Sequence, residues 1–192
     1  HMGITEFLSK KIGKKNNEVM LIYNKELSVS PITTHIPLDQ VTKKINHINI
    51  VKKIKIINNF YKKNFKRKPY FGILGLNPHN YFQSKKSKEK KMIEKTMKNL
   101  NKIKIKAKGP ISPDSSFVIF KKYKFDVLVG MYHDQVLSPF KTLYNFDAIN
   151  ITLGLPFIRI SPDHGVAQDI TGKKIANPKS LIQSIKFFNN IK

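Results

Sequence analysis

Short apolar runs of strand length, separated by longer stretches of helical periodicity, constrain the fold of this chain most. Such runs are rich in Val, Ile and Phe, and they are typical of strands that are buried on both faces of a sheet. We expect strands at residues 18–23, 27–34, 70–76, 126–131, 147–153 and 157–160. A further run at 103–107 alternates Ile with Lys, which predicts an edge strand, because Lys discourages pairing with other chains.

Amphipathic stretches lie between these runs. We expect one helix from Pro37 to Phe60, a second, Lys-rich helix at 84–101, a short helix at 116–123 and a terminal helix at 178–190. Strands that alternate with helices predict an α/β protein with a parallel or mixed sheet.

Three histidines each follow one of the apolar runs. His35, His79 and His133 come after the runs at 28–34, 71–78 and 125–132. Ligands of open α/β sheets bind beyond the carboxyl ends of the strands. A single histidine there is usually an ordinary loop residue, but three together predict a metal or catalytic site. The other three histidines fit this pattern less well: His1 is terminal, His47 is expected within a helix, and His164 follows its apolar run at a distance.

The charge of +24 suggests phosphate or nucleic-acid binding at first sight. The basic residues are nearly all Lys, with Arg only at positions 67 and 159, whereas nucleic-acid surfaces usually exploit the forked contacts of Arg. The lysines are also spread along the chain without interleaved aromatic residues. We therefore interpret them as a solvated surface with biased composition and expect no nucleic-acid partner, although anionic substrates would be attracted.

Residues 126–170 differ in composition from the rest of the chain. They contain a single lysine, Lys141, and five of the twelve acidic residues. Burial explains why lysine is rare there, but it does not explain the polar residues within the segment. The polar residues are His133, Asp134, Gln135, Lys141, Asn150, Thr152, Arg159, Asp163 and His164.

The absence of cysteine excludes disulfides, thiolate metal sites and catalytic thiols. No apolar stretch is long enough to span a bilayer, and no signal peptide is visible, so we expect a soluble cytoplasmic protein with no membrane partner. No Gly-x-Gly-x-x-Gly follows a strand, so the common dinucleotide fingerprint is absent.

Several strings of this sequence resemble the 4-hydroxythreonine-4-phosphate dehydrogenase family of pyridoxine biosynthesis. Their order and spacing agree over nearly the whole chain, which corresponds to the C-terminal portion of the family. The matching strings are residues 3–7 (GITEF), 33–38 (TTHIPL), 75–79 (GLNPH), 109–114 (GPISPD), 131–135 (MYHDQ), 150–159 (NITLGLPFIR) and 161–165 (SPDHG).

The resemblance implies a three-layer α/β fold like that of the isocitrate and isopropylmalate dehydrogenases. It implies that His35, His79 and His133 bind a divalent metal such as Zn, Mg or Co, at a homodimer interface to which the partner chain supplies one histidine. Residues 1–177 would form the metal- and substrate-binding, dimerising domain. The helix at 178–192 would pack on an N-terminal domain that lies upstream.

The resemblance also implies a reaction and its residues. NAD or NADP would oxidise 4-(phosphooxy)-L-threonine, and decarboxylation would then give 3-amino-2-oxopropyl phosphate. Thr5, Lys141, Asn150 and Arg159 match substrate-binding positions, and Lys141 and Asp114 are candidate catalytic residues, with helix capping as the alternative for Asp114. We expect the cofactor to face two turns, Gly154-Leu155-Pro156 and Asp163-His164-Gly165.

The chain departs from the family at Ile4, where the family has a substrate-binding histidine, and in the residues after His79. Two alternatives therefore remain beside the dehydrogenase. One is a paralogue acting on a threonate or erythronate phosphate, and the other is a non-catalytic dimerising domain.

Overall fold

The computed structural model describes residues 4–13, 17–78, 87–165 and 167–191. Their sheet has the strand order β4-β3-β5-β2-β1-β6-β7. The strands are β1 (Val19–Tyr23), β2 (Ser28–Pro31), β3 (Phe71–Leu74), β4 (Ala107–Ile111), β5 (Val127–Gly130), β6 (Ile149–Leu153) and β7 (Arg159–Pro162). The helices are α1 (Ile4–Lys11), α2 (Leu38–Lys44), α3 (His47–Phe65), α4 (Lys88–Lys102), α5 (Pro113–Tyr123), α6 (His133–Tyr144), the short 3₁₀ helix η2 (Gln168–Ile170) and α7 (Lys179–Asn190).

The sheet is mixed, as predicted. Strands β4, β3, β5 and β2 run parallel to one another, whereas β1 pairs antiparallel with both β2 and β6, and β6 pairs antiparallel with β7. The carboxyl ends of β3, β5 and β2 therefore meet at one edge of the sheet. These are the strands that precede His79, His133 and His35.

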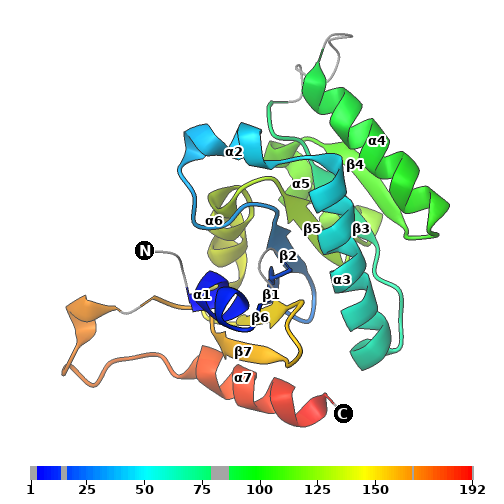
Figure 1. Cartoon of the computed structure of the whole chain (residues 1–192). Coiled ribbons are helices and arrows are strands. Elements are labelled where there is room, and N and C mark those ends of the chain that lie inside the picture. The colour runs from blue at the N-terminus through cyan, green and yellow to red at the C-terminus, as the bar shows by residue number, and fades with distance from the viewer. Residues whose placement is uncertain (1–3, 14–16, 79–86, 166, 192) are drawn as a thin grey trace.

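Helices cover both faces of the sheet and complete the three layers (Figure 1). One core contains apolar residues of α3 and α4, with Phe187 of α7 packed against it. The other contains residues of α5 and α6, such as Phe120 and Phe140. Alternate residues of β1 show the division: Leu21 belongs to the first core, whereas Met20 and Ile22 belong to the second. The predicted three-layer α/β architecture is confirmed.

Two expectations about individual elements are wrong. The stretch from residue 37 to residue 60 forms two helices, because the side chain of Asn46 accepts the backbone N–H of Asn49 at 2.9 Å and starts α3 there. His47 therefore lies at the start of a helix. The edge strand is β4 and not residues 103–107, because α4 continues to Lys102 and the backbone of Lys104 then turns with a φ of 54°. Residues 4–11 and 133–144, for which we named no element from the sequence, form α1 and α6.

The terminal helix α7 packs on the same sheet as the other helices. The ring centroid of Phe187 lies 4.9 Å from that of Tyr23 and 5.9 Å from that of Phe65. The opposite side of α7 is exposed, so its expected packing on a further domain stays a prediction. The exposed apolar residues are Leu181, Ile182, Ile185 and Phe188.

Candidate functional site

Two of the three strand-end histidines lie side by side. The imidazole rings of His35 and His133 have centroids 5.7 Å apart and are tilted by 42°. His35 follows β2, and His133 is the first residue of α6, shortly after β5. Since β2 and β5 are parallel neighbours, the segments that follow them place both rings at the same edge of the sheet.

The local chain holds these two histidines in place. Thr33 donates its hydroxyl to the carbonyl of Met131 at 2.7 Å, which ties the segments after β2 and β5 together. Nδ1 of His133 lies 2.7 Å from a carboxylate oxygen of Asp134. A carboxylate at one ring nitrogen orients an imidazole whose other nitrogen binds a metal.

The two neighbouring imidazoles are donors of a type that divalent metals bind. Bonds of about 2 Å from one ion to two imidazoles leave the ring centroids roughly 5 Å apart, close to the observed separation. His79 lies outside the described residues, and among those that are described no group of three metal-ligating side chains occurs. The metal site therefore stays a prediction, supported by the pair formed by His35 and His133.

Two buried polar residues, to which we assigned no role in the site from the sequence, hold the segments that lead to the predicted histidines. Gln135 accepts the N–H of Met131 and donates to the carbonyl of Gly75, both at 2.7 Å, and so joins the ends of β5 and β3. Glu89 of α4 accepts the N–H groups of Leu76 and Asn77, shortly before His79. Glu89 and Glu94 are the two acids of the Lys-rich helix α4, and the position of Glu89 in its first turn was the available sequence signal.

Lys141 lies on α6 with His133 and contacts Asp163. Its Nζ donates to the carbonyl of Asp163 at 3.3 Å and lies 3.6 Å from the carboxylate. Burial raises the pKa of the Asp163 carboxyl, although Lys141, His133 and His164 lower it.

Asn150 and Arg159 lie on the two strands of the β6–β7 hairpin. Asn150 is opposite Ser161, and Arg159 is opposite Thr152 and donates to its hydroxyl at 3.1 Å. These positions share one face of the hairpin, because side chains alternate along a strand. The buried Oδ1 of Asn150 has no hydrogen-bond partner among the described residues. An acceptor of this kind can receive a hydrogen bond from a ligand.

The remaining predicted substrate and catalytic residues lie at helix starts. Thr5 belongs to the first turn of α1, and Ser9 of that helix donates to Glu18 at 2.6 Å, just before β1. Asp114 is exposed in the first turn of α5 and accepts the N–H of Ser115 at 2.9 Å. The N-cap of α5 is Ser112, so Asp114 satisfies an N–H of the first turn without being the cap itself.

The structure does not bring the five predicted cofactor-binding residues together. Gly154, Leu155 and Pro156 form the tip of the β6–β7 hairpin and line a 240 Å³ cavity against α3. Asp163 and His164 follow the far end of the same hairpin, since Ile149 pairs with Pro162. Moreover, Gly154 has a structural role, because its φ is +81° and an added Cβ would lie 1.9 Å from the carbonyl oxygen of Asn17.

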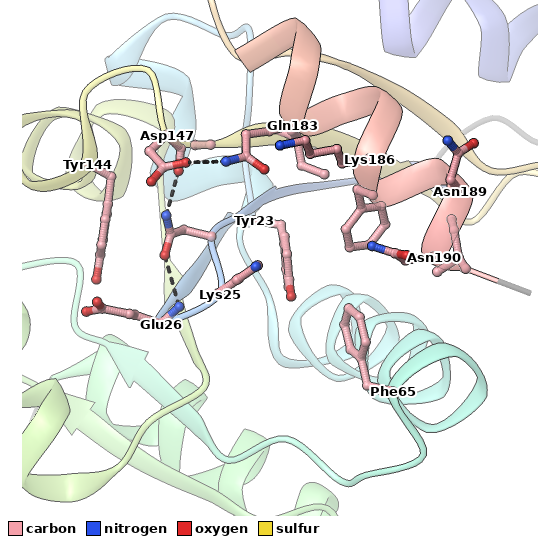
Figure 2. Close-up of a pocket in the computed structure, with 15 residues that line it drawn as sticks. Tyr23, Lys25, Glu26, Phe65, Tyr144, Asp147, Gln183, Lys186, Asn189 and Asn190 are labelled. Atoms are coloured by element: carbon pink, nitrogen blue, oxygen red, sulfur yellow. Dashed lines mark hydrogen bonds between the residues drawn. The ribbon is translucent and has the colours of Figure 1, made fainter. Parts of the chain in front are cut away.

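A larger cavity of 660 Å³ lies away from the histidines, between the β1–β2 turn and the end of α7 (Figure 2). Asp147 accepts hydrogen bonds from Asn24 and Gln183 there, at 2.6 and 3.0 Å. Burial raises the pKa of Tyr144 in its wall to about 12, so this hydroxyl stays protonated at neutral pH. No histidine lines this cavity among the described residues, and we place the candidate site at the His35 edge instead.

A mixed sheet covered by helices on both faces, with histidines at its carboxyl edge, defines the class. The chain is an α/β protein of the isocitrate dehydrogenase-like fold. An isocitrate dehydrogenase from Methylococcus capsulatus superposes with a TM-score of 0.63 at 14% identity, over 98% of this chain and 63% of that one. The chain belongs to the family described as pyridoxal phosphate biosynthetic protein PdxA, whose model matches residues 1–188.

Relatives and solved structures agree with this membership. The chain is 43% identical to a 4-hydroxythreonine-4-phosphate dehydrogenase of Sulfurihydrogenibium sp. over 97% of its length, and 39% identical to one of Aquifex aeolicus over 98%. It covers 58% of each relative. A crystal structure of 4-hydroxythreonine-4-phosphate dehydrogenase from Klebsiella pneumoniae superposes with a TM-score of 0.82 at 31% identity, over 100% of this chain and 59% of that one. The predicted family is therefore confirmed. No described helix meets the length and hydropathy that a membrane span requires.

Proposed function

We propose that this chain forms the metal- and substrate-binding part of an NAD- or NADP-dependent 4-hydroxythreonine-4-phosphate dehydrogenase. Its reaction is the oxidation of 4-(phosphooxy)-L-threonine, followed by decarboxylation to 3-amino-2-oxopropyl phosphate. The observation that carries the proposal is the pairing of His35 and His133 at the sheet edge, in a chain whose relatives carry that name. The chain spans about 58% of those relatives, so the full reaction requires a test on the chain itself.

His35 and His133 hold the metal in this proposal, and His79 is the third ligand. A bound divalent cation would polarise the substrate hydroxyl, and the nicotinamide would accept a hydride. Asp134 keeps the ring of His133 oriented through its contact with Nδ1. We further propose, from the resemblance, that two copies of the chain share the site.

Three side chains bind the substrate in this proposal. Arg159 carries five N–H donors, so its bond to Thr152 leaves others for a phosphate or carboxylate. Asn150 accepts a hydrogen bond through its buried Oδ1. Lys141 binds the substrate carboxylate or moves a proton at Nζ. The resemblance adds Thr5, in the first turn of α1, as a further substrate-binding residue.

Metal analysis of the purified chain, combined with a substrate assay, tests this function. We expect bound divalent metal, and NADH or NADPH formation that depends on 4-(phosphooxy)-L-threonine and is lost in His35→Ala. His47→Ala is the matched control, because His47 is the first residue of α3 and follows a helix rather than a strand of the sheet. A chain that binds neither metal nor dinucleotide would instead be a non-catalytic domain.

One observation favours a second substrate class. Ile4 is 65% exposed at the start of α1, where the family has a substrate-binding histidine, and isoleucine cannot donate a hydrogen bond. The alternative substrate is a threonate or erythronate phosphate. Comparing dinucleotide reduction across a panel of phosphorylated hydroxy acids distinguishes the two.

A further inference from the structure

Asp163 is a buried acid in contact with a candidate catalytic lysine. Its side chain is 8% exposed, whereas that of Lys141 is 44% exposed. The ammonium of Lys141 meets Asp163 twice, through the backbone carbonyl at 3.3 Å and through the carboxylate at 3.6 Å. Two contacts to one residue fix both the position and the direction of a long, flexible side chain.

The position of Asp163 is itself fixed by the fold. Its N–H donates to the hydroxyl of Ser180 at 2.8 Å, and that hydroxyl donates to the carbonyl of Ala148 at 2.5 Å. Ser180 is fully buried in the first turn of α7. Asp163 is therefore held between α7 and the start of β6, and it offers Lys141 of α6 a rigid anchor.

Burying this carboxylate costs stability. The pKa of Asp163 is raised because burial outweighs the neighbouring positive charges. In addition, its buried Oδ2 has no hydrogen-bond partner among the described residues. A buried acid with an incomplete set of partners destabilises the fold, and such groups concentrate at functional sites.

We propose that Asp163 is a positioning residue that fixes the Nζ of Lys141 for the reaction. This inference rests on the proposed function, because it takes the role of Lys141 from there. An ammonium has three donors, so the backbone contact and the ion pair leave a third for the substrate. Fixing that donor in advance lowers the entropic cost of the reaction. Asp163 thereby acts through Lys141 and is not assigned to the dinucleotide.

A labelling experiment tests the contact without relying on activity. The purified chain is treated with limiting acetic anhydride, and the modification rate of each lysine is read by peptide mass spectrometry. In Asp163→Asn we expect Lys141 to react about 2- to 5-fold faster, as suits the loss of a part-exposed ion pair. Asp147→Asn is the matched control: it releases Lys179, whose Nζ lies 3.2 Å from Asp147, and leaves Lys141 unchanged. An unchanged Lys141 rate in Asp163→Asn overturns the proposal.

A double-mutant cycle in the dehydrogenase assay tests whether Asp163 acts through Lys141. We expect Asp163→Asn to lower kcat/KM about tenfold or more in the parent, and to have almost no further effect in Lys141→Met. Independent, additive losses would show a merely structural role and overturn the proposal. The proposed function fails if the parent chain binds neither divalent metal nor dinucleotide. In a parent chain without activity, the labelling rates alone decide whether Asp163 holds Lys141.

Discussion

The buried hydroxyl of Ser180 joins the residue after β7 to the residue before β6, accepting the N–H of Asp163 and donating to the carbonyl of Ala148. Through this one side chain, α7 fixes the position of one end of the β6–β7 hairpin, which carries Asn150 and Arg159. The terminal helix is thus part of the support of the candidate site.

Ser180→Ala should lower the free energy of unfolding by about 1–3 kcal/mol, because it leaves the N–H of Asp163 and the carbonyl of Ala148 buried without their partner. Urea unfolding followed by circular dichroism measures the change. Ser184→Ala is the control, since that hydroxyl only bonds the carbonyl of Ser180 one turn back in the same helix. Equal losses in the two variants would contradict the bridging role.

His133→Ala should weaken binding of a divalent metal by more than roughly 100-fold. Losing a residue that only supports a ligand costs about 10- to 100-fold in metal affinity, and this substitution removes a ligand itself. The sheet should stay folded, since the ring of His133 is part-exposed. Metal titration and thermal unfolding measure the two effects. Equal metal affinity in mutant and parent would remove His133 from the ligand set.

Arg159→Lys should raise the Michaelis constant of the phosphorylated substrate about tenfold or more, with little effect on stability. A lysine cannot reproduce the two-point contact of a guanidinium with a phosphate or carboxylate. Initial rates over a range of substrate concentrations measure this change. An unchanged Michaelis constant in an active variant would place Arg159 outside the site.

Gly154→Ala should destabilise the chain by several kcal/mol, because the new Cβ collides with the backbone of Asn17 at a φ of +81°. Gly172→Ala separates the two causes: its φ is +79°, but nothing lies within 4 Å of an added Cβ. We therefore expect Gly172→Ala to cost only about 1–2 kcal/mol, which thermal unfolding can measure. A similar cost at both positions would mean that the contact with Asn17 is relieved by a small shift.

Stability should depend on pH through Asp163, whose carboxyl pKa is raised by burial from the usual 3.8. Between 3.8 and the raised folded pKa, the folded protein keeps a proton that the unfolded chain releases. The free energy of unfolding therefore falls as pH rises through that window. Asp163→Asn should lose this dependence. Urea unfolding midpoints, measured across mildly acidic pH, would show the difference between parent and variant. If the midpoints of both proteins changed with pH in parallel, Asp163 would not be the source of the pH dependence.

The fold class was predictable because burial leaves a local mark in the sequence. The runs at β2, β3 and β5 consist of residues that a doubly covered sheet requires, and they were found within a few residues of their true ends. Boundaries were less certain where a single polar contact decides them. The cap at Asn46 is one such case. Helix α6 was not predicted at all, and it contains Pro139, a residue type that disfavours helix interiors.

The sequence alone determined that histidines follow three buried strands, because that statement depends only on the order of residues along the chain. Only the tertiary structure could decide that β2 and β5 are parallel neighbours, which brings His35 and His133 together. It also decided that Gly154 and Asp163 lie at opposite ends of one hairpin, and that α7 holds Asp163 beside Lys141. Strand order, register and helix docking arise from packing between distant segments, and short-range sequence patterns do not record which distant segment a residue will meet.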